Sequence, residues 1–190
     1  MAAAVEIKFD EAKMKRLQRM FRTMPGKLPQ VMSRAINKTS KSAKTQIVKE
    51  LRKDINSTAK GINKAIKSTR ATTSTWQSII NILDRRIPLI SFKAKPTKKG
   101  TTYKVRVSGG RDLAESAFIQ TMKSGHKGVF KRKRGVKRNP IRELFGPSPG
   151  KAFEGAGGIA AKVTAEAYKN LEKNIDSQID LILHKLRRSA

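Results

Sequence analysis

The sequence has no cysteine, few acidic residues and no long apolar run. Without cysteine, the chain has no disulfide framework, thiolate metal site or cysteine nucleophile. Its 14 Asp and Glu residues are scattered, so paired carboxylates for hydrolytic catalysis are not expected. No segment approaches the roughly 18 consecutive apolar residues of a membrane-spanning helix. Acids appear early in MAAAVEIKFDEAK, where a secretory signal needs an apolar core. We therefore expect a protein that stays in the cell where it is made.

Basic residues, by contrast, are abundant: 43 Lys and Arg give the chain a net charge of +29. Such an imbalance costs self-repulsion in the compact state, so we expect a partner that compensates it. Nucleic acid is the usual partner of so basic a chain, and an acidic protein neighbour would serve equally well. With 190 residues, of which 37% are hydrophobic, the chain is expected to form a single domain around a modest core.

Helical periodicity dominates the N-terminal part of the chain. Asp10 is a candidate N-cap for a short amphipathic helix whose apolar residues recur in steps of three and four up to Met24. A second, longer helix is expected at about residues 29–53, and Ser57 is a candidate cap for a third helix at residues 58–67. The second helix carries a basic stripe, which fits either a solvated face or a polyanion contact.

Residues 68–122 have the pattern of strands. The segment 68–76 is rich in Thr and poor in helix formers, which predicts a strand or extended edge. Period-two alternation in Leu89–Lys95 and Tyr103–Val107 predicts an antiparallel hairpin within residues 87–108. Weaker strand candidates are Phe118–Met122 and Gly128–Lys131. The residues expected to be buried in the hairpin are Ile90, Phe92, Tyr103, Val105 and Val107.

Residues 123–150 combine positive charge with Gly and Pro. Nine Lys or Arg and no acid occur in residues 123–142. This pattern predicts a long, poorly structured basic loop, which is either a functional element or a solvated tip. With only Phe130 and Phe145 as aromatic residues, attraction to phosphate backbones or to an acidic protein fits better than base stacking. The candidate polyanion- or partner-binding residues are Lys123, His126, Lys127, Lys131, Arg132, Lys133, Arg134, Lys137, Arg138 and Arg142.

From Gly158 onward the helical pattern returns. Apolar residues from Ile159 to Leu186 recur mostly in steps of four, so the apolar stripe winds around a long helix and can pack on more than one surface, including a neighbouring subunit. We therefore predict an α+β fold, with a small central antiparallel sheet, N-terminal helices and a long C-terminal helix. The expected regions are an N-terminal helical region at 1–67, a sheet region at 68–122, the basic loop at 123–150 and the C-terminal helix at 151–190.

Catalytic and metal-binding chemistry has little support in the sequence. No Asp, Glu or Cys lies near His126, and His184 lies near the basic C-terminus, so neither histidine is expected to bind a metal. No cofactor is expected either. One enzyme class stays open, because a small basic endoribonuclease could use His126 with Lys127, Arg132 and Arg138. A basic nucleic-acid-binding protein without sequence specificity is the other alternative.

Two stretches resemble a known family. The first is RRIPLISFKA at residues 85–94; the second is SGHKGVFKR at residues 124–132, followed by PIRELFGPS at residues 140–148. With basic N-terminal helices before them and a C-terminal helix after them, they resemble the phage minor tail protein Z family of siphophage tails and prophages over nearly the whole chain. After the GVF motif, the segment Lys131–Arg138 is longer and more basic than the family pattern.

The resemblance implies a structural protein without catalytic residues that acts in tail completion. Such proteins act at the head-proximal end of the tail, near the tail terminator, the tail tube or the head connector, and related neck and tail proteins form rings that are commonly sixfold. The expected location is the virion, with assembly in the host cytoplasm, and contact with genomic DNA stays open. Leu144 and Phe145, in a bend set by Gly and Pro, are candidate anchors at a subunit interface. Ordinary core packing is the alternative for both.

Overall fold

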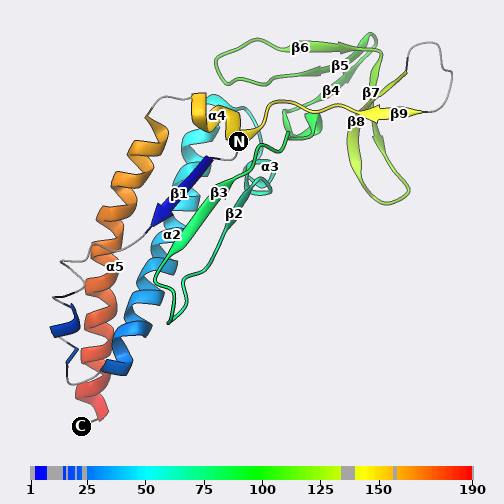
Figure 1. The fold of residues 1–190 in the computed structure, drawn as a ribbon. Helices are drawn as coiled ribbons and strands as arrows, with labels where there is room; N and C mark the ends of the chain where they lie inside the picture. The colour runs from blue at the N-terminus through cyan, green and yellow to red at the C-terminus, as the bar shows by residue number, and fades with distance from the viewer. Residues whose placement is uncertain are drawn as a thin grey trace. The chain divides into compact units, whose positions relative to one another are not determined.

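The computed structural model describes residues 3–7, 15, 17–19, 21–22, 25–133, 140–155 and 158–189 (Figure 1). The chain forms two compact units, each assembled from segments that are distant in the sequence. The first, here called the strand-rich unit, comprises the described residues of Met1–Ala3, Val48–Ile66 and Ile82–Ala156. The second, the helical unit, comprises those of Ala4–Ile47, Lys67–Asn81 and Gly157–Ala190.

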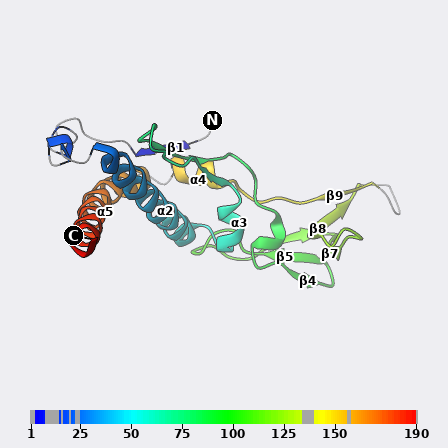
Figure 2. The same cartoon turned by 90° about the horizontal axis from the view of Figure 1, so that it is seen from below.

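Two long helices dominate the helical unit. α2 spans Leu28–Asp54 and α5 spans Ile159–Ser189, and the two lie side by side (Figures 1 and 2). Asn174 on α5 donates a 2.9 Å hydrogen bond from Nδ2 to Oγ1 of the buried Thr39 on α2. The buried apolar residues of the two helices in this unit include Val31, Ala35, Ala43, Ile47, Val163, Ala167, Leu171, Ile175, Ile179 and Ile182. Both long helices were predicted correctly, because their apolar stripes are local patterns in the sequence.

A three-stranded sheet in the order β1-β3-β2 accompanies the helices. Its strands are β1 (Ala3–Ile7), β2 (Ile66–Ser68) and β3 (Ser78–Ile82). Alternate residues of β1 and β3 are buried, namely Val5, Ile7, Ile80 and Ile82. This is the burial pattern of strands with one face on a core.

Of the strand predicted at residues 68–76, only Ser68 lies in a strand, at the end of β2. Asn37 on α2 satisfies both backbone groups of Ala71: its Nδ2 donates to the carbonyl oxygen at 2.8 Å, and the Ala71 N–H donates to its Oδ1 at 2.9 Å. The Thr75 N–H donates to Oγ1 of Thr72 at 2.9 Å. Side-chain hydrogen bonds of this kind offer the backbone an alternative to a strand ladder, so the Thr-rich segment turns instead of pairing.

Shorter elements precede and follow α2. Leu17–Arg19 are helical, and Leu17 and Phe21 are buried, in agreement with the predicted first helix. Its other marker residues, Asp10, Met14 and Met24, lie outside the described residues. The 3-10 helix η1 (Pro25–Lys27) leads into α2.

The third helix is shorter than predicted and is capped by a different residue. α3 spans Ala59–Asn63, and its N-cap is Thr58 rather than Ser57, because Thr58 Oγ1 accepts the Gly61 N–H at 3.1 Å. The helix does not reach residue 67, since the Ala65 carbonyl oxygen accepts the Leu83 N–H at 2.8 Å and β2 begins at the next residue.

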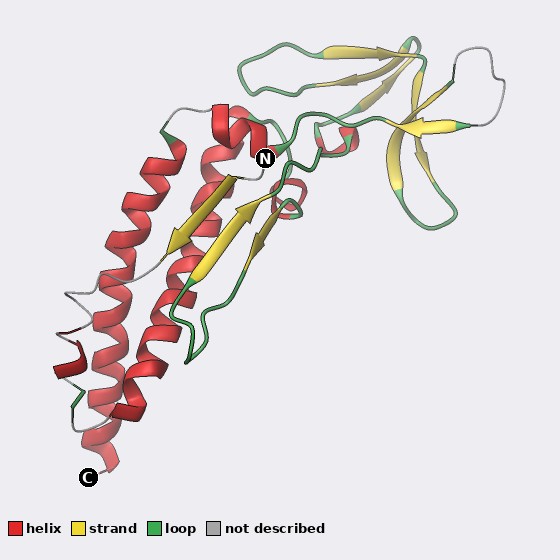
Figure 3. Cartoon of the chain, in the orientation of Figure 1, coloured by secondary structure: helices red, strands yellow, loops and turns green. Residues whose placement is uncertain are grey.

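The strand-rich unit contains two further three-stranded antiparallel sheets, in the orders β4-β5-β6 and β7-β8-β9 (Figure 3). Their strands are β4 (Lys95–Thr97), β5 (Gly100–Tyr103), β6 (Asp112–Glu115), β7 (Ala117–Thr121), β8 (Lys127–Arg132) and β9 (Ile141–Glu143). The 3-10 helix η2 (Leu89–Ser91) precedes the first sheet, and α4 (Pro149–Gly155) follows the second.

The α+β class is therefore confirmed, but the single central sheet is wrong. The described residues form three small sheets, and the chain turns at Ser116 between two of them. The Ser116 backbone adopts a left-handed conformation with φ of 57°, which turns the chain between β6 and β7. One sheet ends there and the next begins.

The antiparallel hairpin predicted within residues 87–108 is confirmed in part: β4 and β5 pair across a turn at Lys98 and Lys99, but its strands are shorter than predicted. Residues 89–91 form η2, and Lys93 has a φ of 51°, which interrupts an extended chain. The Lys104 N–H still donates to the Phe92 carbonyl oxygen at 3.0 Å. Residues 105–107 pair instead with residues 54–56: the Asn56 N–H donates to the Val105 carbonyl oxygen at 2.8 Å, and the Val107 N–H donates to that of Asp54 at 2.9 Å. Of the five residues expected to be buried, Phe92 is fully buried; Ile90, Tyr103 and Val105 are half-buried and Val107 is exposed.

The loop predicted at residues 123–150 contains regular structure. β8 and β9 lie within it, the β8 candidate at Gly128–Lys131 is confirmed, and α4 begins at its end. Val129 and Phe130 are buried in β8, and this apolar anchoring outweighs the surrounding charge. Residues 134–139, between the two strands, lie outside the described residues.

No helix in the described part of the chain is long and apolar enough to cross a membrane.

Candidate interaction surfaces

Seven of the ten candidate polyanion-binding residues lie on the β7-β8-β9 sheet or in the segments that adjoin its strands. Lys127, Lys131 and Arg132 lie on β8, and Arg142 lies on β9. The other candidates in the described chain are Lys123 and His126, between β7 and β8, and Lys133, directly after β8. All seven are exposed except Lys131, which is half-buried. The remaining three, Arg134, Lys137 and Arg138, lie outside the described residues.

The strand register assigns three of these cations to one face of the sheet. Lys131 is directly opposite Arg142 on β9. Lys127 lies on the same face, because it is four residues from Lys131 along β8 and side chains alternate between the two faces. We call Lys127, Lys131 and Arg142 the basic face. Among the residues of the three strands, the acid Glu143 lies opposite Phe130 and therefore on the other face. Like charges directly opposite one another are destabilising, so the Lys131–Arg142 pair would gain from an external anion.

The other face is a row of rings and charges. The guanidinium carbon of Arg132 lies 4.8 Å from the ring centroid of Phe118, whose centroid is 6.3 Å from that of Phe130. The ring of His126 meets Phe130 edge-on at 6.3 Å, and its Nε2 lies 3.0 Å from Oε1 of Glu143. Arg132 and His126 are thus engaged within the protein, whereas Lys127 and Arg142 of the basic face are exposed.

Gly128 makes room for this row. A Cβ at position 128 would lie 2.7 Å from Oε1 of Glu143 and 2.9 Å from Cζ of Phe130. Any larger residue would displace the glutamate or the ring, so the GHKGVF motif needs glycine here.

The endoribonuclease constellation is not assembled by these contacts. His126 is paired with Glu143, and Lys127 lies on the opposite face of the sheet from Arg132. Arg138, the remaining member, lies outside the described residues.

The second candidate surface is built by two segments far apart in the sequence. The Leu89 N–H donates to the Leu144 carbonyl oxygen at 2.9 Å, and the Gly146 N–H donates to that of Ile87 at 2.8 Å. Pro88 and Phe145 face each other in this antiparallel bridge. The IPL and ELFGPS motifs are therefore partners in the fold. Phe145 is 47% exposed, whereas Leu144 is half-buried.

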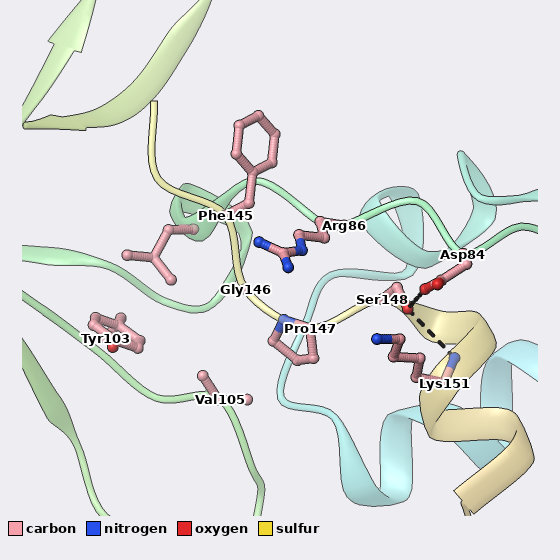
Figure 4. A pocket seen from close by; sticks show the side chains of 10 residues that line it. Asp84, Arg86, Tyr103, Val105, Phe145, Gly146, Pro147, Ser148 and Lys151 are labelled. Carbon is pink, nitrogen blue, oxygen red and sulfur yellow. Dashed lines mark hydrogen bonds between the residues drawn. The ribbon is translucent and has the colours of Figure 1, made fainter. Parts of the chain in front are cut away.

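Beside this bridge lies a pocket of about 490 Å³, here called the Phe145 pocket (Figure 4). Its lining residues are Asp84, Arg86, Leu89, Tyr103, Val105, Phe145, Gly146, Pro147, Ser148 and Lys151. Ser148, 2% exposed, donates a hydrogen bond from Oγ to Oδ1 of Asp84 and accepts the Lys151 N–H at 3.3 Å. Ser148 thereby joins the segment after β3 to the first turn of α4.

A comparison with protein families covers both surfaces. The family model described as prophage minor tail protein Z matches residues 7–185. The chain belongs to this family. No curated protein and no solved structure matches it. The minor tail protein is a component of the phage tail, and membership of a tail protein family implies contacts with other tail proteins. It also implies a structural role rather than an enzymatic one.

Sequence reasoning found the cations of the minor tail protein but not their arrangement. It predicted neither the like-charged pair nor the Glu143–His126 contact, because both depend on the register of β8 against β9. It named Phe145 but missed Arg86 and Lys151, which line the same pocket. Arg86 lies within the RRIPLI motif, but only the pairing of this motif with ELFGPS shows that Arg86 lines the pocket.

Proposed function

We propose that this minor tail protein acts in tail completion, at the head-proximal end of the tail where the tail meets the head connector. In this role it forms a closed ring in the virion against another tail or neck protein. Its basic face turns toward a polyanion, for which the phosphate backbone of the genomic DNA is the strongest candidate.

The observation that carries the proposal is the Lys131–Arg142 pair on the basic face, which no acid of the three strands offsets. Two cations held opposite each other by a strand register are costly unless an anion lies nearby. A phosphate backbone supplies such anions and releases its counterions on binding, which favours association without regard to base sequence.

The aromatic rings of the sheet do not suggest base recognition. Phe130 is buried, and Arg132 lies over Phe118, so neither ring offers an unobstructed stacking platform. This supports a backbone contact, as expected for DNA that passes a structural ring whatever its sequence.

To test the proposal, Lys127, Lys131 and Arg142 are replaced together by Ser, and binding to duplex DNA is measured across a range of salt concentrations. The matched control replaces Lys169, Lys173 and Arg187, exposed residues of α5, and thus changes the net charge equally. We expect the first variant to reduce the slope of log affinity against log salt by about 2 to 3, the loss of two or three phosphate contacts, and the control to leave it nearly unchanged.

The same two variants are then tested for the ability to complete tails that lack the protein. The proposal requires the basic-face variant alone to lower the yield of infectious particles. Equal losses from both variants would mean that only net charge matters. Weaker DNA binding with normal tail completion would favour the alternative, a nucleic-acid-binding protein outside the tail.

A further inference from the structure

We infer that the Phe145 pocket is the docking site for an acidic residue flanked by an apolar side chain, presented by a different protein of the tail. This deepens the proposed function, because it names the chemistry of the protein partner. It rests on assembly with other tail proteins and does not require that the basic face touches DNA.

The charges of the pocket call for a carboxylate. Its charged lining groups are the cations Arg86 and Lys151 and the acid Asp84. In the described part of the chain, neither cation forms an ion pair, and the carboxylate of Asp84 accepts the hydrogen bond of Ser148. Figure 4 shows Arg86 and Lys151, from separate segments, both extending toward the Gly146–Pro147 segment. Two unpaired cations beside one occupied acid favour a negatively charged ligand.

The apolar lining of the pocket favours an apolar side chain next to that carboxylate. Leu89, Val105, Pro147 and the ring of Tyr103 line the pocket, and Phe145 exposes nearly half of its surface at the same place. A free phosphate would neutralise the cations but leave these apolar side chains exposed to water. An Asp or Glu next to a Leu, Ile or Phe would pair with the cations and also pack against the apolar lining. Interfaces commonly combine a buried hydrophobic anchor with a few charged contacts in this way.

The pocket is held in shape before any partner arrives. The bridge between residues 87–89 and 144–147 fixes one wall, and the hydrogen bond from Ser148 to Asp84 fixes α4 against the other. Gly146 lies so close to the buried Phe92 that an added Cβ would be 2.5 Å from the ring. Because the site is preformed, binding does not require its side chains and backbone to become ordered, and this favours a stable complex.

A second copy of this chain is a poor occupant. The chain has 14 acids against 43 Lys and Arg, and two copies at a net charge of +29 each repel one another. A different and more acidic tail protein meets the charge requirement without this repulsion.

The first experiment identifies the occupant in assembled tails. Phe145 is replaced by the photoreactive residue benzoylphenylalanine in the full chain, tails are assembled and purified, and crosslinked peptides are sequenced by mass spectrometry. We expect a peptide of another tail protein that carries Asp or Glu next to an apolar residue. A crosslink to another copy of this chain, to DNA, or to nothing would overturn the inference.

The second experiment tests the charges by exchange. In the Phe145-crosslinking background, Arg86→Glu with Lys151→Glu should lower the crosslink yield about tenfold. Reversing the partner's acid to Lys should restore most of it. Arg85→Glu is the matched control, because Arg85 is exposed, adjacent to Arg86 and outside the pocket lining. If the double variant keeps its melting temperature and the reversed partner does not rescue it, the inference is wrong.

The two proposals fail in different ways. The pocket variants should keep the salt slope of DNA binding, and the basic-face variant should keep the crosslink at Phe145. A lost crosslink with an intact DNA slope therefore concerns the pocket alone, and the reverse result concerns the basic face.

Discussion

Gly146 lies against the ring of the fully buried Phe92, and a Cβ at this position would be 2.5 Å from the nearest ring carbon. At the scale of single residues, this contact sets the bend of the ELFGPS motif and with it the position of Phe145. A side chain here must push the ring or the bridge aside, and both are held by the surrounding core.

We predict that Gly146→Ala lowers the free energy of unfolding by about 1 to 3 kcal/mol, the usual cost of overpacking a core. Urea denaturation monitored by circular dichroism measures the loss. Gly110→Ala is the control, because nothing lies within 4 Å of a Cβ at that position. Equal stability of the two variants would show that the Phe92 contact is easily relieved.

At the scale of elements, β8 organises the second sheet of the strand-rich unit. It pairs with β7 on one side and β9 on the other, and its residue Val129 is fully buried. Val129 lies on the same face of β8 as Lys127 and Lys131, and Phe130 lies on the opposite face, so each face has a buried apolar residue at its centre and the charges lie toward the ends of the strand. The basic surface therefore depends on an apolar strand core.

We expect Val129→Asp to unfold the strand-rich unit or to destabilise it by several kcal/mol, because an unpaired charge would be buried. Val107, which is 46% exposed, provides the matched control. Val107→Asp makes the same chemical change at the surface and should alter stability by less than about 0.5 kcal/mol. Thermal unfolding by calorimetry compares the two, and a Val129→Asp variant that melts like the parent would contradict the register of β8.

At the scale of the whole molecule, net charge governs association. A charge of +29 on 190 residues opposes self-association at low ionic strength, where screening is weak. Membership of a tail protein family requires contacts with other tail proteins nonetheless. The repulsion must then be offset by those partners, by a polyanion or by salt.

Light scattering of the purified protein at low salt should give a mass close to the monomer value of 21.1 kDa. Addition of the tail terminator protein should produce a larger, closed assembly. Raising the salt concentration without that partner should increase weak association only, since screening removes repulsion but adds no specific contact. A stable ring formed by the protein alone at low salt would contradict this balance.

The sequence by itself determined the helices, the charge and the family. The apolar stripes of α2 and α5 repeat with the period of the helix, so neighbouring residues were enough to predict both elements. Net charge is a sum over the chain and needs no structure. The RRIPLI, GHKGVF and ELFGPS motifs pointed to the family whose model matches residues 7–185.

Only the tertiary structure decided the sheets and the surfaces they carry. Tyr103–Val107 alternates like a strand, yet its second half bonds to residues 54–56, and no local pattern reveals that choice of partner. The pairing of Lys131 with Arg142 and the presence of Arg86 and Lys151 in one pocket depend in the same way on contacts between distant segments. Strand partners are selected by packing across the fold, and for that reason the sites of this protein follow from its three-dimensional structure.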